Sequence, residues 1–290
     1  MSDFVILTDS SADLSEEIVQ QQKIQVLPLT VTIGGQDYRD WPDHRELDPH
    51  QFYDRLRKGE VATTAGVNVA SYIEALEPLL QSGKDVLILA FSSGLSTTCN
   101  SAVIAAKELG EKYPDRKIFA VDTLCASLGQ GLLVCYAAHQ RELGFSIEEV
   151  RDWVEDHKLN LCHQFTVDDL YFLKRGGRIS SAAALVGSML HIKPVLHVDN
   201  EGHLINTGRV RGRQASLKAL VDRMEETAID SGSLTVFISH GDCLEDAQEV
   251  AKLVKKHFGV QEIYINYVGP VIGAHSGPGT VALFYMGTAR

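Results

Sequence analysis

An unbroken apolar run at residues 86–91 constrains the fold of this chain more than any other stretch. Its sequence, Val-Leu-Ile-Leu-Ala-Phe, is typical of a strand that is buried on both faces of a parallel sheet. The run stops at a Ser-Ser-Gly turn, residues 92–94, and a helical pattern that begins with hydroxyl residues at 96–98 then continues to Gly110. The turn is either an anion site at the carboxyl end of a strand or an ordinary βα loop before a capped helix.

Strand and helix patterns alternate through the first 160 residues, which is typical of a three-layer α/β domain with a parallel sheet. Polar clusters follow three of the expected strands, at residues 8–11, 92–93 and 122–123. Because the carboxyl ends of parallel strands meet at one edge of a sheet, these clusters are expected to form half of a binding site.

The second part of the chain, residues 161–290, has a different pattern. It contains an expected hairpin with its turn at residues 199–202, followed by two helical patterns and further strands. This mixture favours a smaller α+β domain. We therefore predict an N-terminal α/β domain at 1–160 and a C-terminal α+β domain at 161–290, with the loop near 61–68 able to cross to the second domain.

Composition excludes several classes of protein. The 290 residues are 44% hydrophobic and carry a net charge of −11, which favours a globular chain and argues against nonspecific binding to nucleic acid or to an anionic membrane. The five cysteines have no Cys-x-x-Cys spacing, so we expect reduced thiols in a cytoplasmic protein. Neither a signal peptide nor a membrane-spanning segment is expected, and stable membrane insertion is not predicted.

A stretch rich in glycine and proline, residues 269–280, surrounds a single imidazole, His275. Residues 277–282 match Gly-x-Gly-x-x-Ala, but too few residues follow for the βαβ unit that a dinucleotide site requires. His275 is therefore either a functional side chain in a rigid backbone or a histidine packed in a tight turn.

Two basic clusters, at residues 174–178 and 209–213, stand out in an acidic chain. They are either solvated ion pairs or recognition sites for phosphate or carboxylate. No metal site is predicted, since the histidines at 191, 197 and 203 lack nearby Cys or carboxylate partners. The chain also lacks a nucleophile elbow and a Walker A motif. Hydroxyls, one imidazole and arginines beside apolar helices suit an amphiphile with a small anionic head.

Taken together, these stretches resemble the DegV family, which includes the fatty-acid-carrying subunits of bacterial fatty acid kinase. The resemblance extends along the whole chain, and the matching pieces are residues 8–14, 92–96, 100–102, 122–123, 175–180, 192–194 and 269–280. It implies two α/β domains with a lipid tunnel between them. The loop that begins at Thr64 departs from the family pattern, because Ala-Gly-Val-Asn replaces Ser-Gln-Pro-Ser after the threonine.

The resemblance also implies roles for individual residues. The fatty acid carboxylate would be bound by Thr64, by Ser93 or Ser92, and by His275, with Arg211 near the head group. Arg175 and Arg178 match a basic motif that faces the kinase partner. We expect the acyl tail to contact apolar residues of the second part, namely Ala183, Leu185, Val186, Met189, Leu190 and Ile272.

The leading hypothesis is a lipid-binding carrier that is not itself an enzyme and needs no cofactor. It would present the carboxylate of one long-chain fatty acid to a separate ATP-dependent fatty acid kinase, which forms the acyl phosphate for phospholipid synthesis. One alternative is an acyl hydrolase or transferase that uses Ser93 and His275. Another is a sensor whose bound lipid changes its association with a partner protein.

Overall fold

The computed structural model describes residues 4–180, 191–229 and 234–290. Its first sheet has four parallel strands in the order β2-β1-β6-β7. The apolar run forms the inner strand β6, as the sequence predicts, and its residues 86–90 are fully buried. The strands are β1 (Phe4–Asp9), β2 (Ile24–Leu27), β6 (Asp85–Ala90) and β7 (Ile118–Asp122).

Helices cover both faces of this sheet, because successive side chains of a buried strand point to opposite faces. On β6, Val86 and Ile88 pack into the cluster that includes α3 (Val69–Gln81) and α4 (Thr98–Lys112). Leu87 and Leu89 pack into the cluster that includes α5 (Ser127–Glu142) and α6 (Ile147–His157). The predicted α/β class with a parallel sheet is confirmed.

The second sheet has six strands in the order β10-β9-β8-β13-β11-β12. Its pairs are antiparallel except for β11 with β12. One face packs against α9 (Arg213–Thr227) and α10 (Leu244–Phe258). The strands are β8 (Leu161–Thr166), β9 (Ile192–Val198), β10 (Leu204–Arg211), β11 (Val236–His240), β12 (Ile263–Tyr267) and β13 (Val281–Met286).

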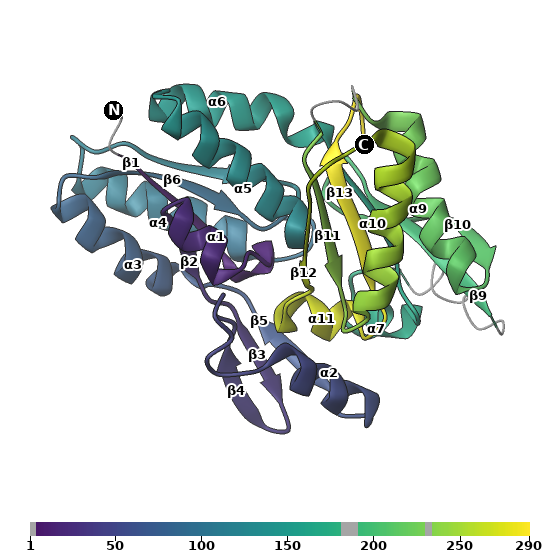
Figure 1. Cartoon of the computed structure of the whole chain (residues 1–290). Coiled ribbons are helices and arrows are strands. Elements are labelled where there is room, and N and C mark those ends of the chain that lie inside the picture. The colour runs from purple at the N-terminus through teal and green to yellow at the C-terminus, as the bar shows by residue number, and fades with distance from the viewer. Residues whose placement is uncertain (1–3, 181–190, 230–233) are drawn as a thin grey trace.

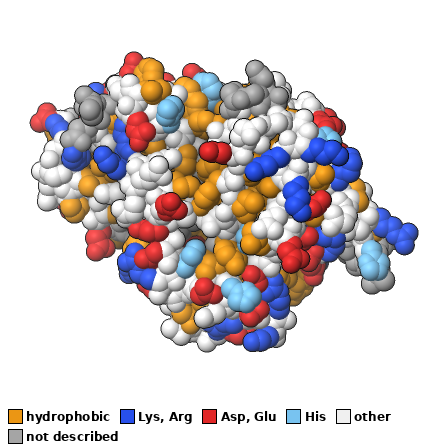
Figure 2. Space-filling view, viewed as in Figure 1, with side chains coloured by type: hydrophobic (Ala, Val, Ile, Leu, Met, Phe, Trp, Pro, Cys, Tyr) orange, Lys and Arg blue, Asp and Glu red, His pale blue; other side chains and the backbone are white. Residues whose placement is uncertain are grey.

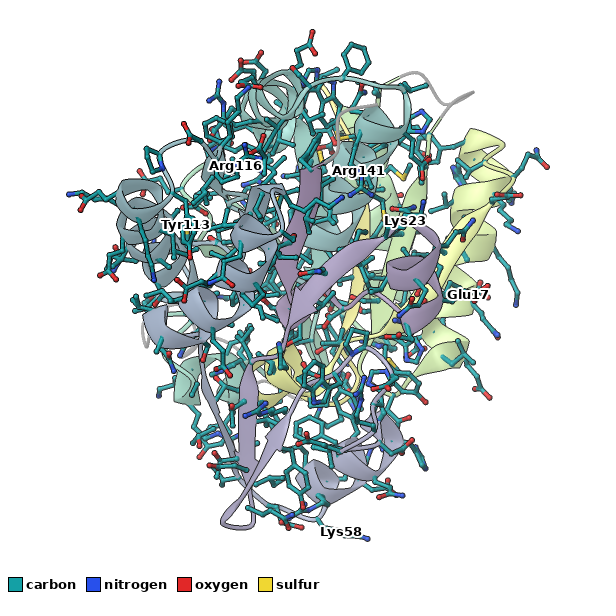
Figure 3. All side chains as sticks on the ribbon, turned by 90° about the vertical axis from the view of Figure 1, so that its left-hand side faces the viewer. Glu17, Lys23, Lys58, Tyr113, Arg116 and Arg141 are labelled. Atoms are coloured by element: carbon teal, nitrogen blue, oxygen red, sulfur yellow. The ribbon has the colours of Figure 1, made fainter. Side chains whose placement is uncertain are left out.

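Helix α5 lies between the two sheets (Figure 1). Its buried residues share one apolar cluster with the first sheet and with Phe284 and Met286 of β13. At the other end of the helix, the guanidinium of Arg141 donates to the backbone carbonyls of Gln22 and Lys23 beside β2 (Figure 3). The predicted boundary near residue 160 coincides with the start of β8, but the shared core leaves the division into two domains a prediction.

A third, small sheet of order β4-β3-β5 extends from the first part together with α2 (Pro49–Arg57) (Figure 1). It contains β3 (Thr30–Ile33), β4 (Gln36–Arg39) and β5 (Ala62–Ala65). The alternating sequence of residues 25–33 is typical of one continuous strand, but the chain leaves the first sheet after β2 and starts β3 beyond Pro28, which has no backbone N–H to donate. The loop that was expected near residues 61–68 contains β5, which pairs with β3.

The turn of the β9–β10 hairpin packs against the Ser-Ser-Gly turn that follows β6. The hydroxyl of Ser92 donates to the carbonyl oxygen of Gly202 at 2.9 Å. Gly202 has φ of +78°, and a Cβ placed there would lie 2.1 Å from Oγ of Ser92. Only glycine combines this left-handed conformation with such a close approach. The contact holds the second sheet beside the carboxyl end of β6.

Replacing Gly202 with alanine is therefore expected to lower the free energy of unfolding by about 1–3 kcal/mol. Gly110→Ala is the matched control, because Gly110 lies inside α4 and a Cβ there meets nothing within 4 Å. The control should raise the free energy of unfolding by about 0.5–1 kcal/mol. Urea denaturation measures both, and equal effects of the two substitutions would contradict the close packing of the turns.

Candidate functional site

A cavity of about 560 Å³ lies between the two sheets, beside the first turn of α5. This volume falls within the range of about 300–1,000 Å³ that is usual for small-molecule sites. Its walls come from β5, from the turn after β6, from α11 (Pro270–Ser276) and from the second sheet. Segments that are far apart in the sequence therefore meet around one cavity.

The strand register of the second sheet explains the apolar floor of the cavity. Ala282 and Phe284 of β13 lie on one face because they are two residues apart. Phe165 and His163 of β8 are opposite them in the ladder, and all four residues line the cavity. His163 is a neutral, fully packed side chain: its Nε2 accepts from the backbone N–H of Ala126 at 3.2 Å, and burial holds its pKa well below the usual value.

One part of the wall carries a threonine–histidine pair. Oγ1 of Thr64 lies 2.7 Å from Nε2 of His275. Thr64 is on β5 and His275 is in the last turn of α11, so the small sheet and the second half of the chain meet here. The sequence suggested a tight turn around His275, and the structure instead contains a short helix, which begins at Pro270, where proline is favoured.

The imidazole of His275 is enclosed on its other side. A Cβ placed on Gly176 would lie 2.1 Å from Nδ1, and this nitrogen has no hydrogen-bond partner among the described residues. Burial, together with the positive charges of Arg178 and Arg175, lowers the pKa of His275 to about 4. The side chain is therefore neutral at pH 7. Nε2 donates to Oγ1 of Thr64 when it carries the proton, and accepts from the Thr64 hydroxyl when Nδ1 carries it.

The two serines of the turn after β6 have different positions. Ser93 lines the cavity, and its backbone N–H donates to Oδ1 of Asp122 at 3.2 Å. Ser92 is buried and is not a lining residue; its hydroxyl donates to Gly202. Ser96, Thr97 and Asn100, around the start of α4, add further polar groups to the wall. Of the two predicted alternatives, the geometry places Ser93 rather than Ser92 against the cavity.

The basic residues are distributed differently from the prediction. Arg178, expected to face a partner, is half-buried and lines the cavity, and its Nε donates to the carbonyl oxygen of Leu95 at 3.1 Å. Arg175 lies over the ring of Phe172, with 4.9 Å from its guanidinium carbon to the ring centroid. Arg211 is exposed at the end of β10 and does not line the cavity. The roles predicted for Arg175, Arg178 and Arg211 stay predictions.

One of the six predicted tail contacts lies in the part of the chain that the structure describes. Ile272 lines the cavity, on the same helix as His275. The other five predicted tail contacts, Ala183, Leu185, Val186, Met189 and Leu190, lie outside the described residues.

Sequence reasoning missed a buried polar group beside the cavity. The hydroxyl of Ser127, the first residue of α5, donates to Oδ2 of Asp13 and lies 2.9 Å from Oγ of Ser239. Asp13 also accepts from the backbone N–H of Gly269 at 3.0 Å, and burial raises its pKa well above the usual value. The spacing of Asp13 and Glu16 is typical of a helix cap, but Ser15 caps the helix Glu16–Gln21 instead. In the sequence, the polar cluster at residues 8–11, just before Asp13, was the signal that could have indicated this buried polar group.

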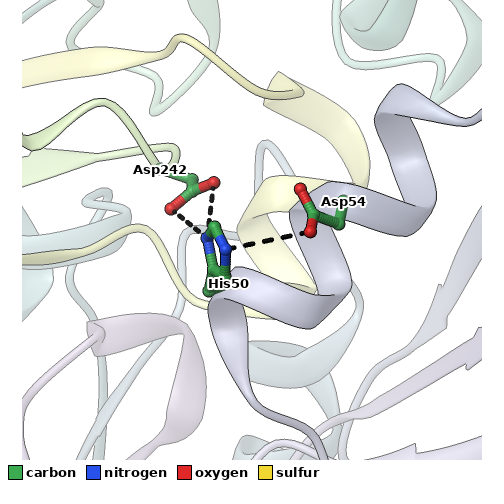
Figure 4. Close-up of side chains that lie close together, drawn as sticks. All are labelled: His50, Asp54 and Asp242. Atoms are coloured by element: carbon green, nitrogen blue, oxygen red, sulfur yellow. Dashed lines mark hydrogen bonds and ion pairs between the residues drawn. The ribbon is translucent and has the colours of Figure 1, made fainter.

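The described residues also contain one group with metal-ligand chemistry, His50, Asp54 and Asp242 (Figure 4). Nδ1 of His50 lies 3.0 Å from Asp242, whereas its Nε2 lies 3.8 Å from Asp54. The two carboxylates are thus on opposite sides of the ring, and Arg57 already pairs with Asp242. The arrangement is that of a surface ion-pair network that joins α2 to the loop after β11.

The geometry gives limited support to acyl hydrolysis. A serine nucleophile needs a base within hydrogen-bonding reach. In the described part of the chain, Nε2 of His275 is paired with Thr64 instead of with Ser93.

None of the described helices is long and apolar enough to cross a bilayer.

Comparison with known proteins gives consistent matches along the whole chain. The family model described as "Uncharacterised protein, DegV family COG1307" matches residues 3–288. A DegV domain-containing protein of Clostridium perfringens is 48% identical and aligns over 100% of this chain and 99% of its own length.

Two solved structures have the same fold. One is described as showing fatty acid binding of a DegV family protein from Thermus thermophilus; it is 30% identical, has a TM-score of 0.85, and the match covers 98% of this chain and 99% of that chain. The other is DegV from Bacillus subtilis, described as a fatty acid binding protein, at 29% identity and a TM-score of 0.85, with coverage of 99% and 100%.

The low pKa of His275 predicts a specific dependence of stability on pH. The unfolded chain binds a proton at this histidine near pH 6.5, whereas the folded protein does not until about pH 4. The free energy of unfolding therefore falls as the pH falls from 7 to 5, and His275 contributes about 2 kcal/mol to this decrease. The contribution of His275 to this decrease should be absent in His275→Gln.

The measurement is urea denaturation of both proteins at pH 7 and pH 5. Other groups, including Asp40 with its pKa raised by burial to about 7, affect both proteins alike. The stability of the wild type relative to the variant should fall by about 2 kcal/mol between the two pH values. An unchanged difference would mean that His275 titrates normally in the folded state.

Proposed function

Because the chain belongs to the DegV family, we propose that it binds one long-chain fatty acid in the cavity between its two sheets. The observation that carries the proposal is the Thr64–His275 pair, with the half-buried Arg178, in the wall of a cavity whose floor is apolar. The fatty acid binding described for the relatives from Thermus thermophilus and Bacillus subtilis supports it.

The acyl chain supplies most of the affinity. Burial of each CH₂ group is favourable by about 0.8 kcal/mol, so a long chain gains far more than a short one. Phe165, Ala282 and Phe284 provide the apolar floor, and Ile272 contacts the chain from α11. Burial of apolar surface has no preferred direction, so the polar end of the cavity has to set the orientation of the ligand.

Hydroxyl groups and a positive charge then bind the carboxylate. In the tautomer that carries its proton on Nε2, neutral His275 donates to Oγ1 of Thr64, and the hydroxyl proton of Thr64 is then free to donate to a carboxylate oxygen. Ser93 offers a second hydroxyl, and Arg178 offers a charge inside the cavity. In this arrangement His275 acts through Thr64 and does not itself bind the carboxylate, which differs from the direct contact implied by the resemblance.

We further propose that the protein is a carrier, which presents this carboxylate to a separate ATP-dependent kinase. Toward the right of Figure 2, where the second half of the chain lies, basic side chains are mixed with acidic ones, so the proposal depends on Arg175 and not on the net charge of this face. Arg175 lies on the same short helix as Leu173, which lines the cavity. We propose that Arg175 contacts the kinase at this edge of the cavity.

Replacing Thr64 with valine tests the head-group assignment. The variant keeps the shape of the side chain but loses the hydroxyl, and affinity for hexadecanoic acid should fall about 10-fold or more. Thr63→Val is the matched control, since Thr63 is the exposed neighbour on the same strand. Fluorescence titration of both variants and the wild type measures the dissociation constants. Equal affinities of the two variants would contradict a role for Thr64, and no binding by the wild type would contradict the proposed function.

A further inference from the structure

The backbone of Gly176 lies directly against the imidazole of His275. A Cβ placed on this glycine would overlap Nδ1 and would lie 3.1 Å from both Cγ and Cε1 of the ring. The conformation of Gly176 does not itself require glycine, because the residue ends α7 (Leu170–Arg175) with φ of −73°, in the right-handed region. The space beside the ring, and not backbone freedom, therefore restricts this position to glycine.

Helix α11, which carries His275, cannot easily shift to relieve such an overlap. A Cβ on Gly273 would overlap the hydroxyl oxygen of Tyr53, and one on Gly277, which ends the helix, would lie 2.6 Å from Cδ2 of Phe172. Tyr53 belongs to α2 and Phe172 to α7, so both elements approach the backbone of α11 without an intervening side chain. In a closely packed interior, an added methyl group has to displace a side chain instead of a helix.

The segment that contains Gly176 also joins two polar parts of the cavity wall. On one side, Nη2 of Arg175 donates to the backbone carbonyl oxygen of Ala274 in α11, at 3.4 Å. On the other side, Nε of Arg178 donates to the carbonyl oxygen of Leu95, in the turn before α4, at 3.1 Å. The segment therefore connects α11 to the turn before α4, and Gly176 lies between these two contacts.

Building on the proposed function, we propose that Gly176 is a positioning residue of the head-group site, which keeps the imidazole of His275 within hydrogen-bonding distance of Thr64. Nε2 of the ring lies 2.7 Å from Oγ1 of Thr64, whereas Nδ1 faces Gly176. A side chain at position 176 would displace the ring and break this pair. The hydroxyl of Thr64 would then lose its fixed orientation toward the carboxylate, although the added atoms never touch the ligand.

The first test is a double-mutant cycle on the binding of hexadecanoic acid, measured by fluorescence titration. Gly176→Ala should weaken binding about tenfold, the loss expected when one hydrogen bond to a charged group is removed. Adding Gly176→Ala to Thr64→Val should cause little further loss, because both substitutions remove the same interaction. Losses that multiply to about a hundredfold would show that Gly176 acts independently of the pair, and would overturn the proposal.

The second test follows the pKa of His275 by NMR titration of its ring protons, which are assigned by comparison with His275→Gln. Burial and two nearby arginines lower this pKa to about 4. In Gly176→Ala the displaced ring should be hydrated, and the pKa should rise toward the usual value of about 6.5. An unchanged pKa would overturn the proposal.

Gly259→Ala is the control for both tests. Gly259 ends α10 with φ of +68°, lies outside the cavity wall, and has nothing within 4 Å of an added Cβ. Alanine there strains the backbone and lowers the stability, but it should change neither the pKa of His275 nor the affinity. A loss of affinity equal to that of Gly176→Ala would mean that lowered stability alone weakens binding.

A further variant covers the case in which Gly176→Ala does not fold. Removal of the ring in His275→Ala makes room for the added methyl group, so in that background Gly176→Ala should not lower the midpoint of urea denaturation further. A further decrease would show that the methyl group overlaps another part of the protein. Failure of the wild type to bind any fatty acid would instead refute the proposed function, which separates that failure from failure of the positioning role.

Discussion

The burial of α5 between two sheets is the interaction on which the rest of the structure depends. Its apolar side chains share one core with Leu87 and Leu89 of the first sheet and with Phe284 of the second. A helix that is covered on both sides holds the two halves of the chain in a fixed relation. The cavity lies at the start of this helix, where Ala126 and Ser127 belong to its wall. The site therefore exists because of the packing that joins the halves.

Desolvation sets the chemistry of the site. His275 is enclosed by Gly176 and lies near two guanidinium groups, and both conditions favour its neutral form. A neutral imidazole donates one hydrogen bond without adding charge, so the positive charge in the cavity wall comes from Arg178. Buried Asp13 has a raised pKa for the same reason, and its hydrogen bonds to Ser127 and Gly269 join α5 to the backbone just before α11. The polar groups thus connect the same elements that the apolar core holds together.

The sequence was most informative where burial alone decides the structure. The apolar run at 86–91 correctly predicted the inner strand of a parallel sheet, because a strand that is covered on both faces is apolar along its whole length. The pattern of the turn after it was compatible with an anion site or with an ordinary βα loop, and it could not separate Ser92 from Ser93. That distinction depends on Gly202, which lies 110 residues away and whose carbonyl oxygen accepts a hydrogen bond from the hydroxyl of Ser92.

Other features depend on contacts that no local pattern encodes. Thr64 was named only through the family resemblance, since a threonine in a short extended segment carries no signal of its own. The two basic clusters were noticed, yet composition does not say which arginine turns inward: Arg178 lines the cavity, whereas Arg211 is exposed. The contact of Gly176 with His275 is visible only once the packing of α7 against α11 is known.

The central claim is that the cavity holds one long-chain fatty acid per chain. Native mass spectrometry of the purified protein, followed by denaturing extraction and identification of the released compound, tests it most directly. We expect an added mass that corresponds to one fatty acid per chain, and its identity would also report the length and substitution of the acyl chain. A protein that is purified without a ligand, and that also fails to take up added fatty acids, would contradict the account.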